Sequence, residues 1–200
     1  MFQPQFDIVA GNPPWINWES LPDDYRTSLI PLNQERYKLF LATGNEARHG
    51  QTKIDLSQLM FYVACDSYLK KGGKLGFVIT QTLFKSQGSA GFRRFEIEKS
   101  GPLKVLQVED LSDIQCFEGA TNRTAILLVE KGRPTEYPVQ YYYWQKAEEG
   151  VRIATDAPHD EVLTLVASAT ARGLPYLCGF GGGGGGWYDE FWIAVGAVLR

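Results

Sequence analysis

Four consecutive residues near the start of the chain, Asn12-Pro13-Pro14-Trp15, combine side chains that suit chemistry on an amine. The Asn12 side chain carries a carbonyl acceptor, and each proline fixes the backbone because its φ is locked and it has no N–H. The Asn12 oxygen and the Pro13 carbonyl can therefore accept both hydrogens of a planar exocyclic amine. This arrangement favours a pyramidal nitrogen, whose lone pair can attack an electrophile without a strong base.

The element that must position these residues is the apolar run 6–10, which predicts a short buried strand that ends at Gly11. In open α/β sheets, ligands bind outside the carboxyl ends of the strands, so the four residues would face a ligand there. Trp15 adds a flat face on which a heterocycle can stack. The alternative is an ordinary proline-rich turn with a buried tryptophan, which is the better explanation for an isolated Pro-Pro-Trp segment.

The surrounding sequence favours the chemical interpretation. The stretch FDIVAGNPPW, residues 6–15, resembles the catalytic motif of amino-group DNA methyltransferases, specifically the adenine-specific, Eco57I-like enzymes of restriction–modification systems. Further segments resemble the same enzymes in the same order within about residues 5–145: Asp55-Leu56, the stretch 69–80, Phe92-Arg93-Arg94-Phe95, Cys116-Phe117-Glu118 and the stretch 124–128. Agreement of several segments in order makes chance similarity a poor explanation.

The resemblance implies a partial Rossmann-like α/β sheet that uses S-adenosyl-L-methionine and acts on double-stranded DNA. It implies that Asn12, Pro13, Pro14 and Trp15 form the catalytic loop, which holds the amine of an adenine flipped out of the duplex. It also implies that Asn12 contributes to the cofactor site. Transfer of the methyl group would then need mainly alignment of the amine nitrogen with the methyl carbon.

Two residues further along the chain receive a role from the same resemblance. Phe117 would help Trp15 to stack on the flipped base, although simple burial explains a phenylalanine comparably well without the family. Asp55 would contact the cofactor or organise the substrate pocket. A carboxylate at a helix start is equally well explained by the helix dipole, so both interpretations of Asp55 stay open.

The sequence departs from the family pattern in small ways and in one large way. Trp15 stands where the family usually has tyrosine or phenylalanine, and Ser57 stands where an aromatic residue is common. Gln81 stands where the family often has a proline after the Ile-Thr pair. Relatives bind the cofactor mainly through a glycine loop and an acidic residue that precede the catalytic motif, and only five residues precede Phe6 here. We therefore expect a partner chain, or missing N-terminal sequence, to supply the cofactor half.

Composition is that of an ordinary globular protein, with 44% hydrophobic and 22% charged residues in 200. Three widely spaced cysteines, no signal peptide and no apolar stretch long enough for a membrane span predict a cytoplasmic chain. The formal charge of −3 gives no general attraction to DNA. Contacts to DNA would come from local basic clusters (Lys70-Lys71-Lys74 and Arg93-Arg94) or from a further domain, and by default these clusters are solvated.

Other candidate sites are weak. His49 and His159 have no cysteine or carboxylate at ligand spacing, so the sequence predicts no metal site. Tyr37 is expected to pack in the core rather than in the pocket, and Asp7 to anchor the strand end.

The chain alternates between predicted strands and helices, which indicates a parallel sheet closed by an antiparallel edge hairpin. The predicted elements are a strand at 6–10, a polar connection at 17–31, a helix at 33–43, a helix at 53–70 stopped by Gly72-Gly73, a strand at 74–80, a short helix at 90–99, a strand at 103–108, and a hairpin of 123–130 with 138–144. In such a sheet the first strand is central, and its second edge needs strands from elsewhere.

We divide the chain into the catalytic-loop half of a methyltransferase domain at 1–145, a connecting region at 146–178, and a glycine-rich linker with a short apolar tail at 179–200. Adenine methylation of DNA is the leading function. Two alternatives remain: a methyltransferase that acts on RNA bases or on a protein glutamine, since both present a planar amine, and an inactive truncated fragment.

Overall fold

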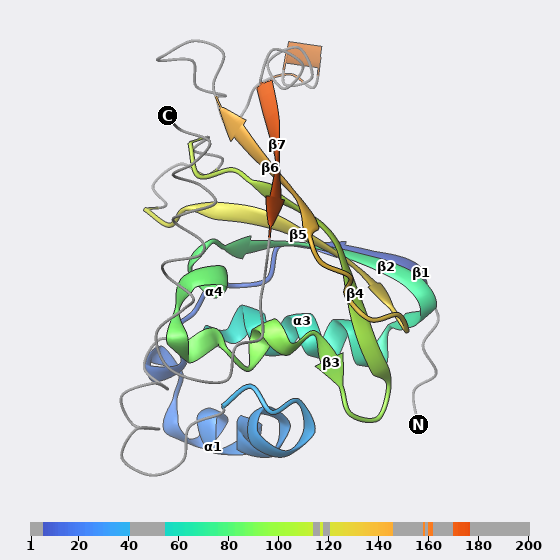
Figure 1. Cartoon of the computed structure of the whole chain (residues 1–200). Coiled ribbons are helices and arrows are strands. Elements are labelled where there is room, and N and C mark those ends of the chain that lie inside the picture. The colour runs from blue at the N-terminus through green and yellow to red at the C-terminus, as the bar shows by residue number, and fades with distance from the viewer. Residues whose placement is uncertain are drawn as a thin grey trace.

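The computed structural model describes residues 6–40, 55–113, 117, 121–145, 158, 160–161 and 170–176. They form an α/β fold, which confirms the predicted fold class (Figure 1). The strands are β1 (Phe6–Gly11), β2 (Leu69–Thr80), β3 (Glu96–Ile97), β4 (Gly101–Asp110), β5 (Thr124–Lys131), β6 (Val139–Gln145) and β7 (Thr170–Tyr176). The helices are α1 (Asp23–Pro31), α3 (Leu56–Ser67) and α4 (Thr82–Lys85), with single turns η1 (Trp18–Ser20), η2 (Leu32–Arg36), η4 (Gln87–Ser89) and η5 (Phe92–Arg94).

The strands lie in the order β1-β2-β5-β4-β6-β7, and β3 pairs with β4 away from this path. β1 runs parallel to β2, and β4 runs parallel to β6, whereas β5 is antiparallel to both of its neighbours. β6 and β7 form an antiparallel pair at one edge. β1, β2, β4 and β6 therefore run in one direction, and β5 and β7 run in the opposite direction.

The predicted hairpin of 123–130 with 138–144 is wrong as a pairing, although both segments are strands. β4 lies between β5 and β6, so the antiparallel edge is formed by β6 and β7 instead. The physical reason is that β5 is an apolar strand, and its place between β2 and β4 satisfies the backbone groups on both of its edges.

The core lies between the sheet and α3, and α1 lies on the side of α3 away from the strands (Figure 1). Phe61 and Tyr62 of α3 are fully buried, and the Phe61 ring meets the Phe77 ring of β2 at 6.2 Å between centroids. On the opposite face of the sheet, Val78 and Ile126 are only half-buried. The described helices thus cover one face.

The predicted helix at 53–70 exists but is shorter, because α3 ends at Ser67 and β2 begins at Leu69. Gly72-Gly73 therefore lies inside β2 and does not stop the helix. Leu69 is fully buried and pairs with Phe6 of β1. The strand therefore begins before Gly72-Gly73 rather than after it. The register with β1 shifts after Phe6, which accommodates the positive φ of 80° at Gly72.

Two predictions near the N-terminus are wrong. The expected connection at 17–31 contains α1, none of whose residues is buried, so no apolar periodicity marks it. Asp23 and Asp24 stabilise its first turn, since carboxylates interact favourably with a helix N-terminus. The expected helix at 33–43 is limited to η2, because Lys38 adopts a positive φ of 50°. The stretch 41–43 lies outside the described residues.

The predicted short helix at 90–99 is also wrong, since it contains only the turn η5 and the strand β3. Phe95 has a positive φ of 48°, which ends the turn. Arg93 is buried, and its Nη1 donates to the carbonyls of Leu83 and Ser86, each at 2.8 Å. Arg93 is therefore neither a solvated residue nor part of a basic surface.

β1 stands at the end of the strand order, and among the described strands only β2 pairs with it. Phe6 is 51% exposed and Ile8 is 74% exposed, although both are apolar. Asp7, near the start of β1, forms an exposed ion pair with Lys70 at 3.0 Å, and its predicted anchoring role stays a prediction. β7 lies inside the stretch 146–178, and 179–200 is outside the described residues. No described helix is long and apolar enough to cross a membrane.

Candidate active site

The Asn12–Trp15 loop (residues 12–15) begins where β1 ends. Gly11 pairs with Phe77, and a Cβ at residue 11 would come within 3.2 Å of the Phe77 ring, so the glycine lets the strand end lie close to it. Asn12 is exposed, and no described residue forms a hydrogen bond with its side chain. Pro13 is buried beneath it. The loop thus presents an open amide at the carboxyl end of a strand.

The end of the loop is held by β2 and α3. The Trp15 ring is half-buried, and its Nε1 donates a hydrogen bond of 3.3 Å to the carbonyl of Val78. The carbonyl of Ile16 then accepts from the backbone N–H of Leu56 at 2.8 Å. Asn17 forms an isolated antiparallel bridge with Asp55. The path of the loop is therefore fixed by the carboxyl-terminal half of β2 and by the N-terminus of α3.

Asp55 caps the N-terminus of α3 and ties it to the end of β2. Its Oδ1 accepts from the N–H of Ser57 at 2.9 Å and from the Ser57 hydroxyl, and its Oδ2 accepts from Thr80 Oγ1 at 3.2 Å. Burial raises the pKa of Asp55, and the hydrogen bonds from Ser57 and Thr80 oppose that shift only in part. The predicted helix-dipole role and the pocket role are both compatible with this position, since Asp55 also pairs with the chain just after the loop.

Trp15 and Phe117 lie in direct contact. Their ring centroids are 5.3 Å apart and their planes are inclined by 80°, which is an edge-to-face pair. The two aromatic residues assigned to base stacking are thus neighbours, although 102 positions separate 15 from 117 in the sequence. A planar base between two parallel faces needs about 7 Å, twice a contact distance of about 3.5 Å. Stacking on both rings would therefore require Phe117 to move away from Trp15.

Comparison with protein-family models matches residues 1–117 to the family described as Eco57I restriction-modification methylase. That match covers more than half of the chain. The chain belongs to the Eco57I restriction-modification methylase family.

Several characterised proteins are similar to this Eco57I family member. The Type II methyltransferase M.XhoI of Xanthomonas vasicola is 28% identical over 130 residues, which cover 64% of this chain and 20% of that protein. The Type II methyltransferase M.HincII of Haemophilus influenzae is 23% identical over 131 residues, covering 66% of this chain and 23% of that protein. The chain thus spans about a fifth of the length of these relatives.

Among solved structures, the M protein of the Type I restriction enzyme EcoKI aligns over 80% of this chain and 29% of its own, with 17% sequence identity and a TM-score of 0.48.

A second polar cluster of this Eco57I family member was not predicted from its sequence. Asp110, at the end of β4, is 2% exposed. Its Oδ2 accepts from Gln81 Nε2 at 2.6 Å and from the Tyr141 hydroxyl, and its Oδ1 accepts from the N–H of Ser112 at 2.9 Å and from the Ser112 hydroxyl. The available signal was an aspartate two residues before a serine at a strand end, which is the pattern of an Asx turn.

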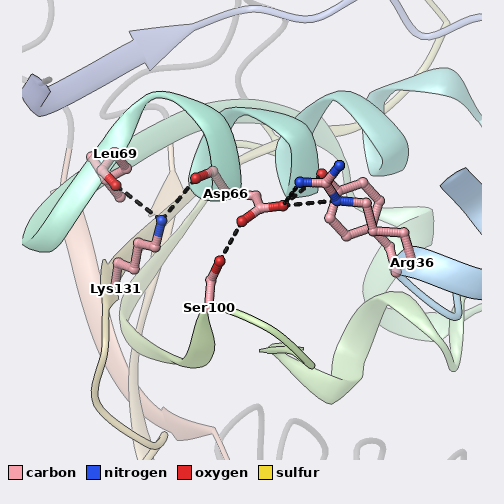
Figure 2. A network of polar contacts seen from close by, with 6 residues as sticks. Arg36, Asp66, Leu69, Ser100 and Lys131 are labelled. Atoms are coloured by element: carbon pink, nitrogen blue, oxygen red, sulfur yellow. Dashed lines mark hydrogen bonds and ion pairs between the residues drawn. The ribbon is translucent and has the colours of Figure 1, made fainter. Parts of the chain in front are cut away.

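A third cluster surrounds Asp66, near the C-terminus of α3 (Figure 2). Its Oδ2 accepts from Arg36 at 2.6 and 3.0 Å and from the Tyr37 hydroxyl at 3.1 Å, and its Oδ1 accepts from the Ser100 hydroxyl. Burial alone raises the pKa of Asp66, but the hydrogen bonds from Ser100, Arg36 and Tyr37 outweigh it, so the pKa is lowered. Tyr37 is 2% exposed, which confirms its predicted place in the core.

Lys131 closes the same end of α3. Its Nζ donates to the backbone carbonyls of Asp66 at 2.9 Å and of Leu69 at 3.0 Å (Figure 2). The residue is 5% exposed, and burial lowers the pKa of its amine. These contacts join α3 to β2 and β5. They lie around the C-terminus of the helix whose N-terminus meets the Asn12–Trp15 loop.

The described part of the chain has no group of three or more His, Cys, Asp or Glu side chains that could hold a metal ion. His49, His159, Cys116 and Cys178 lie outside the described residues. Cys65 is a fully buried free thiol, and burial raises its pKa, so it is protonated at neutral pH and a poor nucleophile.

Proposed function

We propose that this chain carries the amine-binding loop of an adenine-specific DNA methyltransferase of a restriction–modification system. The observation that supports the proposal most is the exposed amide of Asn12 at the carboxyl end of β1, in a loop whose Trp15 ring contacts Phe117. Membership of the Eco57I restriction-modification methylase family agrees with this class of reaction. The specific acceptor, an adenine in double-stranded DNA, is part of the proposal.

The reaction needs an adenine outside the base stack, because its exocyclic amine cannot reach a methyl donor within the duplex. In the proposed complex, Asn12 Oδ1 and the Pro13 carbonyl accept the two amine hydrogens, and Pro14 keeps that backbone rigid. The lone pair of the nitrogen then points away from both acceptors. Held in this way, a weak nucleophile needs no separate general base.

Trp15 gives the flipped base its first stacking face. Its indole Nε1–H is already held by the Val78 carbonyl, so the ring keeps a fixed orientation. Phe117 gives the second face after it leaves its edge-to-face contact with Trp15. Stacking on an aromatic side chain contributes about 1–3 kcal/mol per base, which helps to offset the cost of unstacking the adenine.

S-adenosyl-L-methionine would supply an electrophilic methyl group at this site. The residues present fit part of such a site: Asn12 is open to a ligand, whereas the oxygens of Asp55 already accept from Ser57 and Thr80. We therefore assign Asp55 to the shape of the pocket, through the N-terminus of α3, rather than to a direct cofactor contact. Asn12 lies at the strand end where the cofactor and the base would meet.

Sequence outside this chain would complete the cofactor half by pairing with β1. The exposed apolar residues Phe6 and Ile8, on a strand that only β2 pairs among the described strands, support this part of the proposal. A strand buried in a parallel sheet is expected to be apolar on both faces, and β1 is apolar apart from Asp7 near its start. The additional strands belong to a longer polypeptide or to a partner chain. We call the assembled protein the completed methyltransferase.

Calorimetry with S-adenosyl-L-methionine separates the two halves of the proposal. We expect no measurable heat of binding for residues 1–200 alone, and binding by the completed methyltransferase. Micromolar binding by the isolated chain would contradict the division of the cofactor site between this chain and other sequence.

A panel of tritiated-methyl acceptors tests the reaction itself. The completed methyltransferase is offered four acceptors: duplex DNA, a control duplex that lacks adenine, an RNA of equal length and a glutamine-containing peptide. We expect label in adenine-containing DNA alone, recovered as N6-methyladenine after digestion. Label in RNA or in the peptide would replace the proposed acceptor, and no label in any of them would indicate an inactive fragment.

A further inference from the structure

We infer that Asp110 is a positioning residue for the Trp15–Phe117 ring pair, because its buried carboxylate holds residue 112 before Phe117 and, through Gln81, is connected to residue 123 after it. The inference rests on the proposed function for its catalytic consequence. Its structural content, that Asp110 holds the two ends of the segment that carries Phe117, stands on the contacts of Asp110 and Gln81.

The first anchor is on the N-terminal side of Phe117. Asp110 Oδ1 accepts from both the N–H and the hydroxyl of Ser112, and the N–H of Leu111 donates to the Thr124 carbonyl at 3.0 Å. The chain therefore leaves β4 in a direction that Asp110 itself sets. Such a turn made by an aspartate side chain replaces the strand ladder at the point where the strand ends.

The second anchor is on the C-terminal side of Phe117 and runs through Gln81. Asp110 Oδ2 accepts from Gln81 Nε2 at 2.6 Å, and the backbone N–H of Gln81 donates to the Arg123 carbonyl at 2.9 Å. Gln81 Oε1 also accepts from Lys85 Nζ at 3.1 Å, so the amide cannot turn without losing a partner. The residue just before β5 is thus held by the backbone N–H of Gln81, the residue whose side chain Asp110 binds.

The same carboxylate connects this segment to the Asp55 side of the site. Gln81 directly follows Thr80, whose hydroxyl donates to Asp55. The Tyr141 hydroxyl on β6 also donates to Asp110 Oδ2. Asp110 therefore joins the end of β4 to the residue that follows β2 and to Tyr141 within β6. Because it is 2% exposed, water does not replace these donors.

A purely structural role would make Asp110 a stabiliser of the sheet with no effect on the ring pair. The variant Asp110→Asn separates the two, since it keeps the size of the side chain but turns an amide NH₂ toward Gln81 or toward Ser112. Asp66→Asn is the matched control, because Asp66 is also buried and accepts from three side chains but lies around the other end of α3.

Amide hydrogen exchange on the full 200-residue chain tests the positioning without any assay of activity. We expect Asp110→Asn to speed exchange about tenfold or more in peptides that contain Phe117, since hydrogen bonds to a charged group are among the stronger ones. Asp66→Asn should leave those peptides unchanged and speed exchange around Ser100 instead. Equal exchange near Phe117 in wild type and Asp110→Asn would overturn the inference.

Kinetics of the completed methyltransferase test the catalytic consequence. We expect Asp110→Asn to lower kcat about 10- to 100-fold, the range associated with small misplacements in a site, with less than a threefold change in KM for DNA. The fluorescence rise of 2-aminopurine at the target position should fall in the same variant and persist in Asp66→Asn. Normal kcat and normal fluorescence in Asp110→Asn would overturn the catalytic role.

The two arms also distinguish this inference from the proposed function. If the wild-type completed methyltransferase transfers no methyl group to DNA, the proposed function fails, and the exchange experiment still decides whether Asp110 positions Phe117. If methyl transfer is present and Asp110→Asn behaves as Asp66→Asn in both assays, the proposed function stands and the positioning role is wrong.

Discussion

The two ends of α3 each carry a buried carboxylate, and the surroundings shift the pKa values of the two carboxylates in opposite directions. Asp66, near the C-terminus, accepts from Arg36, Tyr37 and Ser100, and its pKa is lowered despite burial. Asp55, at the N-terminus, accepts from the Ser57 and Thr80 hydroxyls and from the Ser57 N–H, and burial raises its pKa. The fold thus favours the charge at one end and disfavours it at the other.

We propose that the end around Asp66 serves stability and that the end around Asp55 serves the proposed function. A carboxylate matched by a guanidinium and two hydroxyls strengthens the folded state wherever it lies. A carboxylate that burial penalises, on a residue bridged through its backbone to Asn17 just after the Asn12–Trp15 loop, is compatible with a site whose residues were not selected for stability alone. The following changes test that comparison, beginning with the largest expected effect.

Asp66→Ala should cost about 3 kcal/mol of unfolding free energy, measured by urea titration at pH 7. The change leaves the Tyr37 hydroxyl, which is buried, and the Ser100 hydroxyl without an acceptor, at about 1–3 kcal/mol for each buried group. Glu98→Ala is the control, because its ion pair with Lys38 is exposed and should leave the urea midpoint unchanged. A loss below about 1 kcal/mol for Asp66→Ala would remove the stability role.

Asp55→Asn should lower methyl transfer by the completed methyltransferase about tenfold while changing stability by less than about 1 kcal/mol. Asparagine is as good an N-cap as aspartate, and the neutral amide avoids the burial penalty. The altered hydrogen bond to Thr80 changes the wall of the pocket. Full activity with reduced stability is the opposite pattern, and it would make Asp55 a structural cap like Asp66.

Lys131→Met should cost about 1 kcal/mol in the same urea titration. The variant loses two hydrogen bonds to the carbonyls of Asp66 and Leu69, but it also removes a cation whose pKa is lowered by burial. Lys71→Met, at an exposed position of β2, serves as the control and should be neutral. A gain in stability would mean that desolvation of the amine outweighs its hydrogen bonds.

The pH dependence of stability should differ in sign between the two carboxylates, although each contribution is small. The folded-state pKa of Asp66 is lowered, so its contribution is present above about 3.8 and is lost as the pH falls further. The folded-state pKa of Asp55 is raised, so its contribution is present below about 3.8 and is lost as the pH rises above that value. Unfolding of Asp66→Asn and Asp55→Asn between pH 2 and 7 measures both slopes.

Much of the functional end of the molecule could be predicted from local sequence. The apolar run before Gly11, the two prolines and the apolar residues of α3 each act over a few residues, so their patterns survive in the sequence. The closeness of Trp15 and Phe117 came from the family resemblance, because nothing local connects residues so far apart.

The parts that were missed depend on long-range pairing. β5 enters between β2 and β4 because both of its edges need partners, and a hairpin pattern in the sequence cannot express that choice. α1 has no buried residue and so no apolar stripe. Arg93 looked like a surface charge because its acceptors, two backbone carbonyls from the α4 region, carry no sequence signature.

Replacement of Asn12 tests the central claim most directly. Single-turnover methyl transfer to an adenine-containing duplex is measured for the completed methyltransferase with Asn12→Ala, and with Asn17→Ala as the exposed-asparagine control. The account predicts a loss of at least about 100-fold for Asn12→Ala, with duplex affinity unchanged and Asn17→Ala near wild type. Methyl transfer by Asn12→Ala at the wild-type rate would contradict it.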